Sequence, residues 1–166
     1  MNRSNQLSPI HKFMLLVLRF CIGWHLFYQG VGKILAVNWT SRGYLENSTG
    51  PFSGIFHWIV ENPSMLALAD VGTKWGLVIL GLGLMLGLFT RLSAFGGFAL
   101  LMLFYLASPA LVSDGFLVQS AEGTELYVNK TLIEALALSL ILVFPTGQIA
   151  GLDILVRHWT ANRISR

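Results

Sequence analysis

Three ionisable side chains interrupt the long apolar segments of this sequence, where lipid would otherwise surround them. Arg19 and His25 lie in the first apolar stretch, and Glu134 lies in the last. A charged group at bilayer depth is costly, so such residues mark a binding site, a proton path or a structural ion pair. Histidine and glutamate can also exchange protons with a bound molecule. The sequence therefore predicts a buried polar centre inside a membrane protein.

Other polar residues fall at the depth of His25 and Glu134 when depth is counted at about 1.5 Å per helical residue. Gln29 and Lys33 follow His25 at four-residue steps, which places all three on one broad helix face. Lys130 precedes Glu134 by one turn on the last stretch. We expect His25, Gln29 and Glu134 to occupy similar depths, in the outer half of the membrane.

Three further polar positions are placed by the same count. Tyr105 falls near the middle of the third stretch, at the depth of His25. Asp70 and Lys74 mark the outer end of the second stretch, with the spacing of an i,i+4 ion pair. Arg19 lies nearer the inner side, and none of the apolar stretches has an acid at its level.

Each of these residues also has a purely structural interpretation. Arg19 can extend its long side chain to the inner headgroups. His25 can be a hydrogen-bonded core histidine, since one histidine alone makes no metal site. For Glu134 the alternative is an ion pair with Lys130 or Lys33 that does no more than lock two helices together.

Composition sets the class of protein and excludes several others. Hydrophobic residues make up 54% of the 166 positions and charged residues 11%, whereas a soluble domain carries roughly a quarter charged residues. The net charge of +3 comes without a dense basic run, which argues against nucleic acid as a partner. Cys21 is the only cysteine and the four histidines lack ligand spacing. We expect no metal and no covalent cofactor.

The apolar runs predict an all-α integral membrane protein, a four-transmembrane-helix bundle in a single domain of residues 1–166. A long outer loop, 36–71, contains a short amphipathic helix near Gly54–Glu61, and an interfacial tail, 148–166, carries an amphipathic C-terminal helix. Glycines of the second run, including Gly76 and Gly81, would let helices approach closely. The four expected spans are Phe13–Leu35, Gly72–Phe89, Ala94–Val112 and Asn129–Phe144.

The distribution of Lys and Arg predicts the orientation. With four spans both termini share one side, and that side holds Arg3, Lys12, Arg91 and the basic residues of the tail. Most acids fall on the opposite side. Because Lys and Arg are enriched on the cytoplasmic side, we expect a multi-pass protein of the bacterial inner (cytoplasmic) membrane with both termini in the cytoplasm.

Several motifs resemble those of the DoxX family of small four-helix bacterial membrane proteins. The first run carries Arg19, Gly23, Gly30 and Lys33 in that family's order, and the second run follows Asp70 and ends at Arg91. Three further segments resemble the DoxD-type subgroup, the small membrane subunit of thiosulfate:quinone oxidoreductase. They are Gly43 to Phe52, Asn129 to Glu134 and Pro145 to Asp153.

This resemblance implies a membrane subunit that passes electrons from an oxidised substrate of the thiosulfate type to quinone. A quinone needs an apolar, aromatic pocket with a few placed polar groups. We expect it in the outer half of the bundle, with Glu134 and His25 as the catalytic pair that carries protons. The expected binding residues are Arg19, Trp24, Tyr28, Gln29, Lys33, Asp70, Tyr105 and Lys130, with Phe27 and Phe104 as further aromatic walls.

The expected partners are the lipid bilayer and either a second oxidoreductase subunit or a periplasmic redox protein, with a homo-oligomer as a further expectation. The sequence leaves two other functions open. In one, the bundle is a non-catalytic anchor or assembly subunit, whose buried charges set helix register and whose loop 43–52 contacts the partner enzyme. In the other it is a small transporter, although the chain has no inverted repeat and no broken helix.

Overall fold

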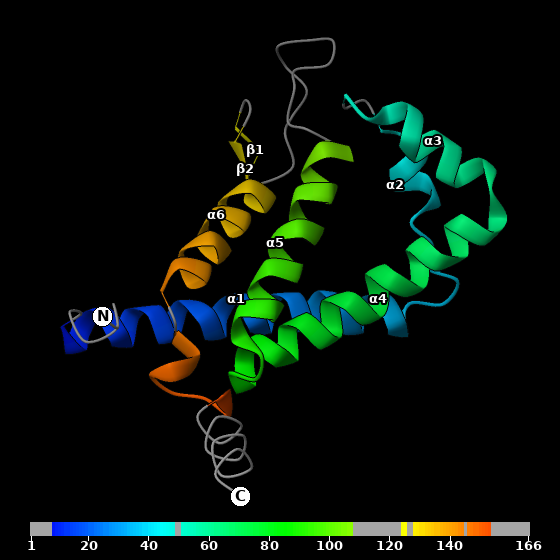
Figure 1. Cartoon of the computed structure of the whole chain (residues 1–166). Helices are drawn as coiled ribbons and strands as arrows, with labels where there is room; N and C mark the ends of the chain where they lie inside the picture. Colours follow the sequence, from blue (N-terminus) through cyan, green and yellow to red (C-terminus); the bar gives the residue numbers. More distant parts are fainter. Residues whose placement is uncertain (1–7, 49–50, 108–123, 126–127, 145, 154–166) are drawn as a thin grey trace, which may run out of the picture.

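The described part of the chain is almost entirely helical, apart from one pair of two-residue strands. The computed structural model describes residues 8–48, 51–107, 124–125, 128–144 and 146–153 (Figure 1). Strands β1 and β2 pair antiparallel, with Thr124 opposite Asn129. The elements in chain order are α1 (Pro9–Leu35), α2 (Arg42–Glu46), α3 (Ser53–Glu61), α4 (Pro63–Leu86), α5 (Thr90–Ala107), β1 (Thr124–Glu125), β2 (Val128–Asn129), α6 (Lys130–Val143) and the 3₁₀ turn η2 (Thr146–Gln148).

Three helices of the described chain, α1, α4 and α5, are long and apolar enough to cross a membrane. They correspond to the first three expected spans. The fourth expected span is also a helix, α6, but it has only 14 residues and falls short of that length. The chain is therefore a multi-pass membrane protein with three helices of spanning length.

The helix that contains the second expected span begins earlier in the chain than the span itself. Helix α4 begins at Pro63 and not near Gly72, because proline is favoured in the first helical turn, where its missing N–H costs nothing. The expected outer loop, 36–71, therefore contains the first turns of α4 as well as α2 and α3. Helix α3 confirms the short helix expected near Gly54–Glu61. The expected end of the third span at Val112 and the helix of the C-terminal tail beyond Asp153 lie outside the described residues.

Glycines bring the backbones of α1 and α4 into direct contact. A Cβ atom placed on Gly81 of α4 would lie 2.5 Å from the backbone nitrogen of Phe27 and 2.7 Å from the carbonyl oxygen of Gly23. A Cβ atom on Gly30 would lie 2.8 Å from the backbone nitrogen of Val78. No side chain fits at these positions. The two helices are held together by close packing of small residues, as is common in membranes.

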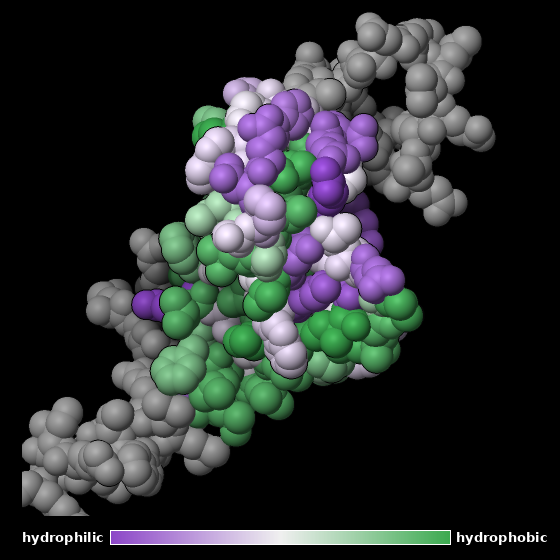
Figure 2. Space-filling view, turned by 90° about the vertical axis from the view of Figure 1, so that its right-hand side faces the viewer, coloured by the Kyte–Doolittle hydropathy of each residue, from purple (hydrophilic) through white to green (hydrophobic). Residues whose placement is uncertain are grey.

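The core lies where α1, α4, α5 and α6 converge. Its fully buried side chains include Leu26, Leu77, Leu84, Leu138 and Ile141. Large apolar side chains also cover the outside of the spanning helices, as expected for surfaces that face lipid. In Figure 2 hydrophobic residues cover most of the lower part of one face, while hydrophilic residues gather toward its top, the end that carries α2 and α3.

A short segment after α6 closes the end of the bundle at which α4 turns into α5, the end expected to face the cytoplasm. The Asp153 carboxylate accepts hydrogen bonds from the backbone N–H groups of Phe89 (2.6 Å) and Thr90 (3.1 Å), at the start of α5. The buried Arg19 donates from Nη1 to the carbonyl oxygen of Ala150 at 2.8 Å, and the Asp153 carboxylate is close enough to attract its charge. The acid missing at the level of Arg19 therefore comes from the chain beyond α6.

We predict that Gly81→Ala weakens the bundle, because the added methyl group would press directly on the α1 backbone. Overpacking of this kind costs about 1–3 kcal/mol, so the apparent Tm in detergent should fall by several degrees. Gly76→Ala is the matched control on the same helix, since its Cβ would meet only Leu100, at 3.8 Å. Equal Tm values for the two variants would contradict the proposed backbone contact.

We also predict that Asp153→Ala lowers the apparent Tm, since it removes the acceptor for two N–H groups at the start of α5 and the acid beside Arg19. Loss of a helix-capping acceptor alone costs about 1 kcal/mol. Glu61→Ala, which removes an exposed carboxylate of α3, is the control and should leave the Tm unchanged. A Tm for Asp153→Ala that matches this control would show that the inner end holds together without the carboxylate.

Candidate functional site

Polar side chains of α1 meet those of the first turns of α6. Nε2 of His25 lies 3.5 Å from Oε1 of Glu134, and Nζ of Lys130 lies 3.9 Å from the same oxygen. On α1, Nζ of Lys33 donates to Oε1 of Gln29 at 3.4 Å. His25 and Glu134 are only partly exposed, at 29% and 17% of their side-chain surface. His25 and Glu134, which depth counting placed at similar levels, are therefore neighbours in the fold.

The position of Glu134 follows from the way α6 begins. Asn129 caps this helix, because its Oδ1 accepts a hydrogen bond of 2.9 Å from the backbone N–H of Leu132. This cap fixes where the helix starts, and it places Lys130 in the first turn and Glu134 in the second. The same face then presents a cation at the outer end and a carboxylate one turn deeper.

These residues line a cavity of about 230 Å³. One side of the lining is polar and comes from α1 and α6, and the other is apolar and comes from α1, α4 and α5. The polar lining is His25, Gln29, Lys33, Lys130, Thr131 and Glu134, and the apolar lining is Leu26, Leu77, Leu101 and Phe104. The arrangement suits a ligand with an apolar ring and polar groups at its edge.

Helix α2 lies against the cavity wall through Tyr44. The Tyr44 hydroxyl donates to the carbonyl oxygen of Phe104, and the two rings meet edge to face with centroids 6.2 Å apart. Burial raises the pKa of Tyr44 to about 12, so the hydroxyl keeps its proton at neutral pH. Because Phe104 lines the cavity, the outer loop contacts the site directly.

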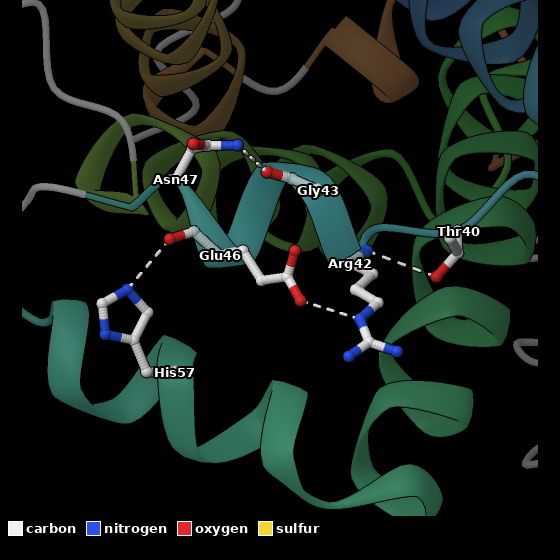
Figure 3. A network of polar contacts seen from close by, with 6 residues as sticks. All are labelled: Thr40, Arg42, Gly43, Glu46, Asn47 and His57. Carbon is white, nitrogen blue, oxygen red and sulfur yellow. Dashed lines mark hydrogen bonds and ion pairs between the residues drawn. The ribbon is translucent and has the colours of Figure 1, made fainter.

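Polar contacts hold α2 and α3 together at this end (Figure 3). The Arg42 guanidinium pairs with Glu46 at 2.8 Å along α2, and Nε2 of His57 on α3 lies 3.1 Å from the Glu46 carbonyl oxygen. Leu45 and Phe56 pack with Ala107, at the end of α5, in a small second core. We call residues 42–61 the outer cap.

The structure brings five of the ten expected site residues into the cavity lining and places the other five elsewhere. Those in the lining are His25, Gln29, Lys33, Lys130 and Glu134. Arg19 lies at the inner end, beside Ala150. Trp24 and Tyr28 point outward, with 51% and 66% of their surface exposed. Tyr105 and Asp70 are not among the residues that line the cavity.

Asp70 lies close enough to Lys74 for the two charges to attract, as expected, and each residue also makes a contact that their spacing did not predict. The Asp70 carboxylate accepts hydrogen bonds from the backbone N–H and the hydroxyl of Ser41, at 2.7 and 2.6 Å, and so fixes the chain after α1 against α4. The Trp39 ring has the ammonium groups of Lys33 and Lys74 at 5.5 and 5.3 Å from its centroid. Both contacts depend on how the connection between α1 and α2 folds back, which helical spacing alone does not reveal.

Sequence reasoning did not identify Thr131 or the three leucines of the lining. Thr131 follows Lys130 in the first turn of α6, so the position of this helix start could have predicted that Thr131 also lies near the site. The leucines resemble every other apolar residue of the spans, and only the packing selects them. In the parts of the chain that the structure describes, no group of three His, Cys, Asp or Glu side chains could hold a metal ion.

Comparison with known proteins places the chain in a family. The family model described as DoxX matches residues 14–110, which cover most of α1, all of α2 to α5 and more than half of the chain. No curated protein and no solved structure matches it. The match includes Gly23, Gly30 and Gly81, which set the contact of α1 with α4, and it includes His25, Gln29 and Lys33. The protein is thus a multi-pass membrane protein of the DoxX family.

Proposed function

We propose that the protein is the membrane subunit of a quinone-linked oxidoreductase and that it binds the quinone ring in the cavity between α1, α5 and α6. The observation that carries this proposal is the pairing of His25 with Glu134, 3.5 Å apart, on the polar side of a cavity whose other lining residues include Leu26, Leu77, Leu101 and Phe104. An ionisable pair held at this depth is costly and is kept where it handles protons or a ligand. DoxX proteins are membrane proteins often linked to quinone oxidoreductases.

The size and lining of the cavity support a ring-shaped ligand. Its volume of about 230 Å³ suits a small ring and leaves no room for a long isoprenoid tail. The tail would leave the cavity and lie along the apolar outer surface of the helices, near Tyr28 and Ile133, which are exposed on α1 and α6. Leu101 and Phe104 would contact the ring face, and Gln29 and Thr131 would hydrogen-bond its oxygens.

The polar pair would supply the protons that the reaction consumes. Reduction of a quinone to a quinol adds two electrons and two protons, one proton to each ring oxygen. Glu134 and His25 are close enough to share a proton and to pass one to an oxygen bound beside them. Lys130, with its ammonium 3.9 Å from Glu134, would stabilise the carboxylate after it has given up its proton.

The electrons would come from a partner on the outer side. The outer cap (residues 42–61) lies there and reaches the cavity wall through the bond of Tyr44 to Phe104. A periplasmic redox protein or second subunit that docks on this cap would stand near the quinone ring. A substrate of the thiosulfate type is the first donor to test, because the motifs of the chain resemble the DoxD-type subgroup.

We further propose that α6 is a fourth, short span, which gives a four-helix bundle in the inner membrane with both termini in the cytoplasm. At about 1.5 Å per residue its 14 residues extend about 21 Å, less than a typical hydrocarbon core of about 30 Å. Its first turns contact His25 in the outer half, and the chain after it reaches Thr90 and Arg19 at the inner end. Local thinning of the bilayer would accommodate the difference.

The second candidate is a non-catalytic anchor for a partner enzyme, and the outer cap favours it. Arg42, Glu46 and His57 give α2 and α3 a defined polar surface that a partner could recognise. In that case His25 and Glu134 would serve only to hold α1 and α6 together. The two candidates differ in which substitutions abolish electron transfer.

We predict that Glu134→Gln reduces quinone reduction at least about tenfold while the protein still folds, because the amide keeps the shape but cannot release a proton. The measurement is donor-dependent reduction of a short-chain quinone by membranes or by the purified complex. Glu61→Gln, on an exposed face of α3, is the matched control and should retain full activity. Unchanged activity in Glu134→Gln, together with loss of activity in Glu46→Ala, would favour the anchor.

A further inference from the structure

The cavity has an excess of positive charge at its outer end. Two ammonium groups, of Lys33 and Lys130, line it together with one carboxylate, that of Glu134. Glu134 already has two partners, since its Oε1 lies 3.5 Å from His25 and 3.9 Å from Lys130. With His25 neutral, the lining carries one more positive than negative charge.

Of the two lysines that line the cavity, Lys33 is the one that the described part of the chain leaves without an acid. No carboxylate oxygen of those residues lies within 4.0 Å of its ammonium, and its contacts are with uncharged groups. One contact is the Gln29 amide oxygen at 3.4 Å, and the other is the Trp39 ring, whose centroid lies at 5.5 Å. Both hold the ammonium at the cavity without neutralising it. Lys33 is itself only partly exposed, so solvent screens its charge incompletely.

We propose that the ligand of this cavity carries an anionic oxygen, which pairs with the Lys33 ammonium at the outer end of the site. The inference rests on the proposed function and specifies the class of ring, namely one with an ionised hydroxyl. The ionised oxygen lies toward Lys33, and the far edge of the ring lies toward His25 and Glu134. A neutral ring would fill the same apolar space but would leave the Lys33 charge unmatched.

Two ring compounds of nearly equal shape test the charge alone. In the hydroxynaphthoquinone lawsone the hydroxyl is a vinylogous acid and is ionised at neutral pH, whereas its methyl ether is neutral. Binding of both to the purified full-length protein is measured by equilibrium dialysis, with empty micelles subtracted. Because a charge-assisted hydrogen bond is stronger than a neutral one, we expect lawsone to bind about tenfold or more tightly than the ether.

Three variants show whether Lys33 is the source of this preference. Lys33→Gln should reduce the ratio of the two affinities to near one, and Lys33→Arg, which keeps the charge, should retain it. Lys74→Gln is the matched control, since Lys74 contacts Trp39 like Lys33 but does not line the cavity. Using the ratio of the affinities removes differences in micelle partitioning, and retained binding of the ether shows that each variant is folded.

The possible outcomes separate this inference from the proposed function. Equal binding of lawsone and its ether to the unmodified protein would overturn the inference and leave a quinone site in place. A preference that Lys74→Gln abolishes as fully as Lys33→Gln would also overturn it, because surface charge in general would then explain the effect. Saturable binding of neither compound would refute the quinone site itself.

Discussion

The backbone contact between α1 and α4 is the constraint on which the rest of the structure depends. Gly23 and Gly30 lie one heptad apart on α1, and Gly81 meets the same face from α4. Because no Cβ atom intervenes, the axes come closer than larger residues would permit. This contact fixes the rotation of α1, and with it the direction in which His25, Gln29 and Lys33 project.

The cavity arises because the other helices pack by a different route. Helix α6 packs mainly on α5, where Gly97 leaves room for Leu138, and it meets α1 in few places. The space between α1 and α6 is therefore incompletely filled, and His25 and Glu134 lie at its edge. A close α1–α4 pair beside a looser α1–α6 pair is a physical basis for a pocket within a small bundle.

The two polar centres of the bundle differ in how their charges are neutralised. At the inner end the protein itself supplies the partners of Arg19. The Ala150 carbonyl oxygen accepts a hydrogen bond from its guanidinium, and the Asp153 carboxylate attracts its charge. At the outer end Glu134 is shared by two groups, while Lys33 contacts an amide and an aromatic ring. We interpret the inner centre as a structural closure and the outer one as a site that receives a ligand.

Local sequence pattern predicted the features that depend on spacing along one helix. The run of apolar residues located α1, α4 and α5, and depth counting along the helices predicted similar levels for His25 and Glu134. Contacts between distant segments were not predictable in this way. Ser41 reaches Asp70 and Ala150 reaches Arg19 only after the connecting segments fold back. Trp24 was expected to form a cavity wall, but the rotation set by Gly23 turns it outward.

The most direct test of a quinone site is photolabelling with an azidoquinone, followed by mass spectrometry of the labelled peptides. Our account predicts that the label appears on residues 25–33 of α1 and 130–134 of α6, and that an excess of unlabelled short-chain quinone prevents it. Labelling spread over the outward-facing residues of α1 and α4, such as Trp24 and Ile79, and unaffected by competitor, would contradict it.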